Sequence, residues 1–188
     1  MAELLMRLMD EIGVSGDEES VRNIIVKQIK PHVDSIKVDQ LGNLIATKKG
    51  KKPSLMLAAH MDEIGLMIKN IHSNGTLAIS VIGGLEPLVL IGQSVKLRTR
   101  KGKTIKGIIT TRELSTDHEV RKLPASYDMF IDTGLTKSEV KKIGIEIGTY
   151  VGFDQKTDYL GGKKNLIVGK AADDRAGCYI LIELIKRL

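Results

Sequence analysis

Aromatic residues are scarce in this sequence, and their scarcity bears on nucleic-acid binding. Tryptophan is absent and the aromatic share is only 3%, which leaves few rings on which bases could stack. A net charge of +6 raises the possibility of an acidic partner. The basic residues, however, gather at 47–52 and 98–103 beside glycines, a pattern typical of solvated hairpin tips. We do not expect nucleic acid as the partner, although binding through a basic β-rich segment stays an alternative.

Cysteine and long apolar runs are scarce as well. The one cysteine, Cys178, has no partner for an internal disulfide, which suits a reducing compartment. No segment approaches the roughly 18 apolar residues of a membrane span. Charges at Glu3, Asp10 and Glu11 interrupt the apolar positions of the N-terminus, so it lacks the core of a signal peptide. We therefore expect a cytoplasmic protein with no membrane partner.

Helical spacing of apolar residues predicts two short amphipathic helices in the N-terminal region. The first covers residues 3–12, and the second runs from about residue 18 toward Pro31. Between them, Ser15 with Glu18 three residues later has the form of a capping box, in which each side chain bonds the backbone N–H of the other. We therefore expect Ser15 to cap the second helix.

The rest of the sequence contains two kinds of pattern. The apolar run SLMLAAH at 54–60 lacks alternation, which is typical of a central strand covered on both faces. From residue 69, turns recur about every ten residues between short β-rich stretches, a spacing that favours a small barrel or sandwich. We therefore predict an α/β fold, with one domain at 1–68 and 163–188 and an inserted, β-barrel-like domain at 69–162.

A histidine and an aspartate stand where the apolar run ends, in the segment AAHMDEIG. In open α/β sheets, ligands bind beyond the carboxyl ends of strands, and His60 and Asp62 occupy that place. An imidazole nitrogen binds borderline metal ions well, and a nearby carboxylate can hydrogen-bond the other ring nitrogen. His60 is thus a candidate metal ligand and Asp62 its orienting partner. A strand-end histidine with a capping aspartate is the simpler explanation of this motif on its own.

Asp173 and Asp174, in AADDRAG, follow an extended segment and open the last predicted helix. Capping and the helix dipole explain most such pairs, at about 0.3 to 1 kcal/mol for each carboxylate. The placement nevertheless repeats that of His60, and a carboxylate can bridge two metal ions about 3.5 to 4 Å apart. Both explanations stay open on these residues alone. The inward stripe that we expect on this helix is Gly177, Ile180, Leu181, Leu184 and Leu188.

Five segments, taken together, resemble a known family. They are GVSGDEESVR, DQLGNLIA, LMLAAHMDEIGLMI, IGG at 82–84 and VGKAADDRAGCY. Their order and approximate spacing are similar to those of the TET-type metalloaminopeptidases, which include the glutamyl and deblocking aminopeptidases. The resemblance covers essentially the whole chain, and the segments around His60 and Asp173 are its most specific part.

The resemblance implies a function and a set of site residues. His60 would be a metal ligand, Asp62 the acid at the catalytic site that orients it, and Asp173 a carboxylate that bridges two divalent ions, zinc or cobalt. Asp174 would follow Asp173 across a cis peptide. The substrates would be peptides cleaved from their N-terminus. The β-rich insertion would serve dimerisation, and dimers would assemble into a dodecamer.

The match extends over only part of the family's expected ligand set. Family members supply a Glu-Glu pair, a further acidic ligand and a final histidine after the Asp-Asp-Arg helix, and these do not occur within residues 1–188. We therefore expect the N-terminal half of the enzyme, with an incomplete site that is inactive by itself. The alternative is a non-catalytic assembly or interaction protein that uses the β-rich insertion.

Overall fold

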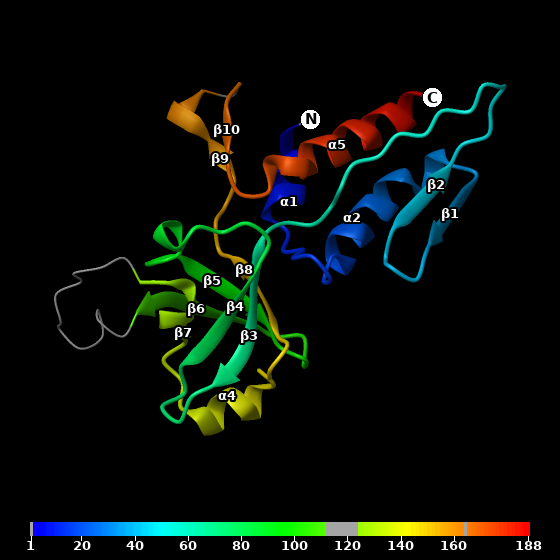
Figure 1. The fold of residues 1–188 in the computed structure, drawn as a ribbon. Coiled ribbons are helices and arrows are strands. Elements are labelled where there is room, and N and C mark those ends of the chain that lie inside the picture. Colours follow the sequence, from blue (N-terminus) through cyan, green and yellow to red (C-terminus); the bar gives the residue numbers. More distant parts are fainter. Residues whose placement is uncertain (1, 112–123, 164) are drawn as a thin grey trace. The chain divides into compact units, whose positions relative to one another are not determined.

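The structure is a computed structural model that describes residues 2–111, 124–163 and 165–188 (Figure 1). It is a mixed α/β structure that contains a closed six-stranded β-barrel. No helix within these described ranges is long and apolar enough to cross a membrane.

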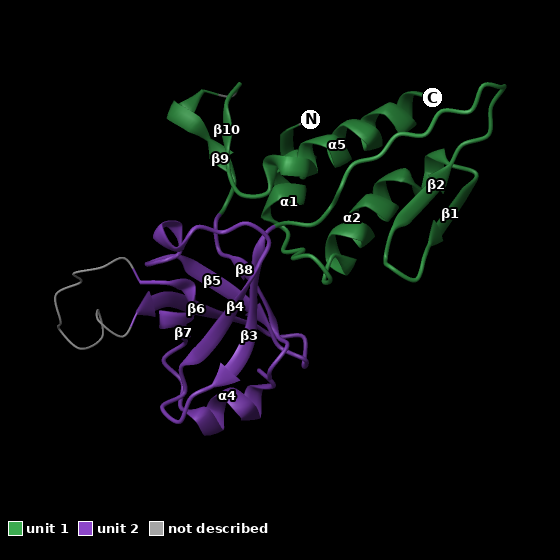
Figure 2. Ribbon diagram, viewed as in Figure 1, with its two compact units in different colours: residues 1–63, 156–188 green, residues 64–155 purple. Residues whose placement is uncertain are grey.

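The chain divides into two compact units, coloured green and purple in Figure 2. Unit 1 comprises residues 1–63 and 156–188, and unit 2 comprises residues 64–155. The boundaries drawn from the sequence, at 68/69 and 162/163, lie a few residues further along the chain. In both divisions one continuous β-rich segment interrupts a unit built from the two ends of the chain.

Unit 2 is the barrel, and every strand pairing in it is antiparallel. Its strands close in the order β3-β4-β7-β6-β5-β8. They are β3 (Gly65–Ile71), β4 (Leu77–Ile82), β5 (Ser94–Arg98), β6 (Thr104–Thr111), β7 (Met129–Asp132) and β8 (Tyr150–Phe153). Closure satisfies the strand edges, so the unit does not depend on a neighbouring sheet. The described part of the unit also contains the short helices η2 (Pro87–Val89), η3 (Ser126–Asp128) and α4 (Lys137–Ile143).

Branched aliphatic side chains fill the barrel and explain why these short strands hold together. Alternate residues of each strand point inward, and the inward set is buried. Its members include Leu66, Ile68, Leu77, Ile79, Val95, Leu97, Ile109, Ile131 and Val151. The basic segment 98–103 lies at the turn between β5 and β6, where the sequence placed a hairpin tip.

Two features of unit 2 follow from the residue types at a turn and at a helix start. The β3–β4 turn contains Gly75 with a φ of 95°, and a Cβ there would lie 2.0 Å from the carbonyl oxygen of Leu135, so only glycine fits. Helix α4 begins at a capping box of Thr136 and Glu139 and ends at Gly144.

Unit 1 packs three helices around a second apolar core. The helices are α1 (Ala2–Asp10), α2 (Glu19–Ile29) and α5 (Ala172–Arg187). Buried Leu8, Val21, Ile25 and Ile182 hold them together. The unit also contains η1 (Lys30–His32), η4 (Leu160–Gly162) and two antiparallel pairs, β1 (Ser35–Val38) with β2 (Leu44–Thr47) and β9 (Asp158–Tyr159) with β10 (Ile167–Val168).

The apolar run at 54–60 is not the buried central strand that its sequence predicts. It forms no strand and pairs with no described strand. Leu55 and Met56 are 83% and 89% exposed. A strand is buried on both faces only when neighbouring strands and helices cover it, and the described part of unit 1 supplies no such neighbours.

The stripe expected to face inward on α5 is also wrong. Ile180, Leu184 and Leu188 are exposed, whereas Arg175, Cys178 and Ile182 are buried. Both sets have helical spacing, so periodicity alone could not choose between them. The side that faces α1 and α2 is the one that carries the buried arginine.

Candidate metal centre

His60 contacts a carboxylate through each of its ring nitrogens. Its Nδ1 lies 2.9 Å from Oδ1 of Asp62, and its Nε2 lies 3.0 Å from Oδ1 of Asp173. The imidazole is 57% exposed and the Asp173 carboxylate 95% exposed. The structure therefore brings together all three residues that the sequence singled out, although 113 positions separate His60 from Asp173.

Asp62 is held in turn by Ser15, whose hydroxyl donates a short hydrogen bond to Oδ2. That bond, and more weakly the contact with His60, lower the pKa of Asp62 against the opposing effect of burial. Asp62 is thus ionised and accepts the Nδ1 proton of His60, which fixes the tautomer of the ring. The expected capping role of Ser15 is wrong: helix α2 has Glu18 at its N-cap and no side-chain cap, because Ser15 bonds Asp62.

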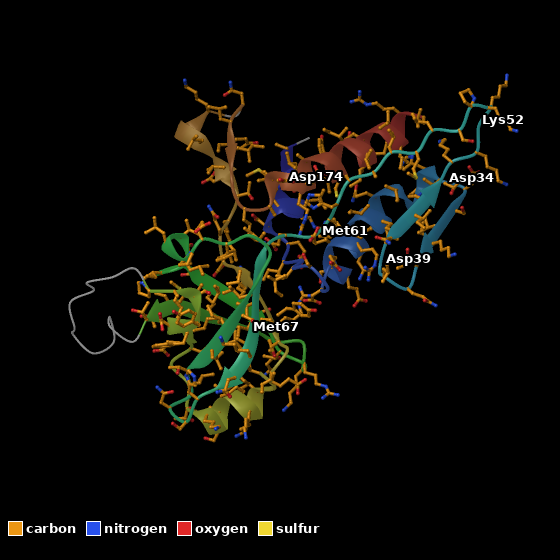
Figure 3. All side chains as sticks on the ribbon, in the orientation of Figure 1. Asp34, Asp39, Lys52, Met61, Met67 and Asp174 are labelled. Atoms are coloured by element: carbon orange, nitrogen blue, oxygen red, sulfur yellow. The ribbon has the colours of Figure 1, made fainter. Side chains whose placement is uncertain are left out.

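Asp173 and Asp174 divide the two roles that the sequence left open. Oδ1 of Asp174 accepts the N–H of Gly177 at 3.0 Å, as a helix cap does. A Cβ on Gly177 would lie 2.3 Å from that oxygen, so a larger residue there would displace the Asp174 carboxylate. Asp173 is left to face His60, and the peptide between the two aspartates is cis, as the family resemblance implied. Figure 3 labels Asp174 at the start of α5 and Met61 on the segment that carries His60.

Cys178 supports the backbone of the site without taking part in its chemistry. Burial raises the pKa of its thiol to about 11, so it stays protonated at neutral pH. Its Sγ lies 3.2 Å from the carbonyl oxygen of His60, to which it donates. The cysteine thus has a structural role.

The contact between His60 and Asp173 suits a cation. Burial lowers the pKa of His60, but the hydrogen bonds to Asp62 and Asp173 outweigh it and raise the pKa above its ordinary value. A proton on Nε2 is therefore stabilised between an imidazole and a carboxylate, and a metal ion can take the place of such a proton. Within the described ranges, no group of three or more His, Cys, Asp or Glu side chains is arranged to hold a metal ion. The residues fit one part of a metal centre.

Three residues around the site were missed in the sequence. Ser15 had been assigned to a helix cap, and neither Glu63 nor Lys170 stood out, yet these two form a buried ion pair. Their positions are 107 residues apart. No local sequence pattern predicts the pairing of Glu63 with Lys170, because the pairing depends on which segments the fold brings together.

Comparison with known proteins identifies the family. The model of the M42 glutamyl aminopeptidase family matches residues 42–188. The chain belongs to the M42 glutamyl aminopeptidase family. This confirms the resemblance drawn from the motifs around His60 and Asp173. The M42 family is metal-dependent, which agrees with the donor atoms that converge between those two residues.

Individual M42-type relatives match along nearly all of this chain. A lysyl aminopeptidase of Pyrococcus furiosus is 33% identical over 99% of the chain. The structure of aminopeptidase APDkam598 from Desulfurococcus kamchatkensis has a TM-score of 0.89 at 36% identity, over 99% of this chain and 51% of that one. The TET1 peptidase of Pyrococcus horikoshii, whose subunits can assemble into a tetrahedron or a large octahedral shell, has a TM-score of 0.88 at 33% identity, over 100% and 56%. The chain spans about half the length of the relatives that it matches.

Proposed function

We propose that this chain is the metal-binding N-terminal half of an aminopeptidase that removes residues from the N-terminus of peptides through a dinuclear zinc or cobalt centre. One observation carries the proposal: in a member of a metal-dependent aminopeptidase family, Nε2 of His60 and Oδ1 of Asp173 meet at 3.0 Å on the surface of unit 1. Neither a cap nor a core packing role accounts for that meeting.

Each side chain of the candidate site has its own role in the proposed metal centre. His60 offers Nε2 as a ligand, and Asp173 offers a carboxylate that can bridge two ions. Asp62 accepts the Nδ1 proton of His60 and so keeps the ring in the tautomer that a ligand needs. Ser15 fixes Asp62 in turn. Two bound ions would supply polarisation of the scissile carbonyl and a water of lowered pKa.

We further propose that residues 1–188 hydrolyse peptides weakly or not at all by themselves. His60 and Asp173 are two donors, whereas a catalytic zinc takes about three protein ligands. The described residues offer no third His, Cys, Asp or Glu at this point. Rapid, chelator-sensitive release of N-terminal residues by the 188-residue chain would contradict this part of the proposal.

The test of the function compares hydrolysis with and without metal. Aminoacyl-anilide substrates are offered to the protein translated from the complete reading frame that contains this chain. Chelation and His60→Ala are each expected to abolish release of the N-terminal residue, and added Zn²⁺ or Co²⁺ is expected to restore it only in the unsubstituted protein. Activity that survives both treatments would refute the metal centre. His72→Ala is the matched control, because Nδ1 of His72 bonds Thr76 in the β3–β4 turn.

A second proposal concerns unit 2, which we infer mediates self-association. Apolar side chains on the barrel unit stay exposed: Leu88 at 70%, Ile147 at 65% and Val89 at 52%. Leu88 and Val89 are adjacent in η2, and neighbouring exposed apolar side chains are typical of interaction surfaces. The assembly of Pyrococcus horikoshii TET1 into closed shells is consistent with such a surface. A homodimer and, by analogy, a dodecamer are the expected products.

Light scattering with size separation tests the association. We expect the 188-residue chain to elute as a dimer or a larger oligomer, and Leu88→Ser with Val89→Ser to shift it toward the monomer. An oligomer without bound metal, in a complete protein that hydrolyses no peptide, would favour the alternative of a non-catalytic assembly protein. A monomer at all accessible concentrations would refute the association.

A further inference from the structure

Three charged side chains of unit 1 are buried together, and we call Glu63, Lys170 and Arg175 the buried ion cluster. Nζ of Lys170 donates to both carboxylate oxygens of Glu63, at 2.7 and 2.8 Å. The side chains of Glu63 and Lys170 are only 3% and 6% exposed. The pair therefore joins two segments, distant in sequence, at a point that water does not reach.

Arg175 extends the cluster to the end of α1. Its side chain is fully buried, and its Nη2 lies 3.9 Å from Oε1 of Glu63. Its Nη1 donates to the carbonyl oxygens of Leu8 and Glu11, and Nζ of Lys170 also lies 3.3 Å from that of Glu11. Carbonyl groups at a helix C-terminus carry partial negative charge. The cluster contains two cations and one carboxylate, and these carbonyl groups offset the charge of the second cation.

The backbone around Glu63 is held by the loop that follows α1. The N–H of Gly13 donates to Oε1 of Glu63 at 3.0 Å, and the N–H of Glu63 donates to the carbonyl of Gly13 at 2.8 Å. The carbonyl of Glu63 accepts the N–H of Ser15 at 3.3 Å. Side chain and main chain of Glu63 are thus both fixed, on the same loop whose Ser15 hydroxyl bonds Asp62.

Stability alone gives a poor reason for burying these charges. Removing an ion from water costs several kcal/mol, and a buried pair is often no more stabilising than apolar side chains of similar volume. Lys170 and Glu63 fill a space that Met and Leu would fill without that cost. What charged groups add is a fixed geometry, because the two hydrogen bonds between them set both distance and direction.

The buried ion cluster lies close in sequence to both candidate ligands. Glu63 is three residues after His60, Lys170 is three residues before Asp173, and Arg175 is two residues after it. The ligand side chains themselves are exposed, and apart from their mutual contact they are held, among the described residues, by the side-chain hydrogen bond from His60 to Asp62. Their separation is set by the backbone segments that carry them, and the cluster ties these two segments together.

The backbone of the loop between Lys170 and Asp173 is conformationally constrained. Ala171 has a φ of 56°, a left-handed conformation that costs a residue with a Cβ about 1 to 2 kcal/mol. Such a conformation persists only where the surroundings impose it. The Lys170–Glu63 pair on one side and the buried Arg175 on the other are the surroundings that the structure offers.

We propose that the buried ion cluster positions His60 and Asp173 at the separation that a metal ion needs. Glu63, Lys170 and Arg175 are positioning residues, since they act on the ligands only through the backbone. This inference rests on the proposed function, because it assigns the cluster to the same metal centre.

Cobalt binding to the 188-residue chain tests the inference without any measurement of activity. Paramagnetic Co²⁺ broadens and shifts the imidazole signals of a histidine that binds it, so an NMR titration gives the affinity at His60 directly. In the double variant Glu63→Gln with Lys170→Met, which removes both charges together, we expect the affinity to fall by about tenfold or more. Lys170→Arg keeps the charge and is expected to stay close to the unsubstituted chain.

A matched variant separates positioning from general destabilisation. Ile29→Ala removes a buried side chain of the same core, 3% exposed on α2, and is expected to cost about 2 to 5 kcal/mol of unfolding free energy. As an aliphatic residue it makes no hydrogen bond or ion pair with the cluster, so Co²⁺ affinity at His60 should not change. Thermal melting of each variant confirms that the titrations are made on folded protein.

The outcomes separate failure of this inference from failure of the metal centre. The titration is repeated on the protein translated from the complete reading frame, and if the His60 signals respond to Co²⁺ in neither protein, the metal centre and the positioning role are both refuted. If they respond and the folded double variant binds Co²⁺ equally well, the cluster does not position the ligands. Glu63→Gln alone, which keeps the side-chain shape, serves if the double variant fails to fold. Its affinity is expected to fall several-fold, and unchanged affinity would also overturn the inference.

Discussion

The two units of this protein bury different kinds of side chain. Unit 2 closes a barrel around aliphatic side chains, and the buried polar residues in its described part are the threonines Thr99, Thr111 and Thr149. Unit 1 buries the charged Glu63, Lys170 and Arg175 and leaves the apolar run at 54–60 exposed. The barrel is thus a scaffold with a closed apolar core, whereas unit 1 carries the candidate site. If the proposed positioning role holds, unit 1 buries charge beside its two candidate ligands, whereas Asp154 of the barrel, 9% exposed, pairs with the more exposed Lys96 and Lys106.

The largest effect is expected from a break in the charged interior of unit 1. Glu63→Ala would leave Lys170 and Arg175 buried without their carboxylate, and we expect a loss of about 3 to 5 kcal/mol in unfolding free energy. Urea denaturation measures this loss, and native-state hydrogen exchange at the amides of α5 measures it independently. A loss below about 1 kcal/mol would mean that the cluster is hydrated in solution and that the comparison of the two interiors fails.

One substitution made in both units tests the contrast between buried and exposed apolar side chains. Leu77 of the barrel is fully buried, whereas Leu55 is 83% exposed. Leu77→Ala is expected to cost about 3 kcal/mol through lost burial and a cavity, and Leu55→Ala less than about 0.5 kcal/mol. Equal losses in denaturant unfolding would show that 54–60 is covered in solution, for example by another copy of the chain.

The sequence allowed the self-contained parts to be predicted and failed where a segment depends on distant partners. The turn at Gly75, the cap at Thr136 and the barrel strands follow from local patterns. The run at 54–60 was wrong because its burial depends on neighbours that local sequence does not specify. In the site, the placement of His60 and Asp173 suggested their meeting, whereas the pairing of Glu63 with Lys170 follows only from the fold.

Asp154 is the barrel's counterpart of the buried ion cluster, because its side chain is only 9% exposed and pairs with the more exposed Lys96 and Lys106. Hydrogen bonds from Lys106 and Lys96 hold the pKa of Asp154 below its ordinary value of 3.8, against the effect of burial. Because the folded pKa is the lower one, the stabilisation is present above pH 4 and is lost as the pH falls through that folded pKa. Asp154→Asn should cost about 1.5 kcal/mol at neutral pH and little in strong acid. A cost that does not depend on pH, in denaturant unfolding across that range, would contradict the ion pairing.

The smallest effect concerns the constrained loop of unit 1. Ala171→Gly removes the steric cost of a left-handed residue but adds chain entropy to the unfolded state, so a net gain of about 0.5 to 1 kcal/mol is expected. The melting temperature should rise by a few degrees. Gly75→Ala in the barrel is the reverse substitution and should be strongly destabilising, since its Cβ would meet the carbonyl of Leu135. A lower melting temperature for Ala171→Gly would show that the loop is not constrained.

The central claim, a metal ion held between His60 and Asp173, is tested most directly by anomalous diffraction at the zinc edge. The measurement uses crystals of the protein translated from the complete reading frame, grown with Zn²⁺. The account predicts an anomalous peak about 2.0 to 2.1 Å from Nε2 of His60 and in contact with the Asp173 carboxylate. Full zinc occupancy at other residues, with His60 still hydrogen-bonded to Asp173, would contradict it.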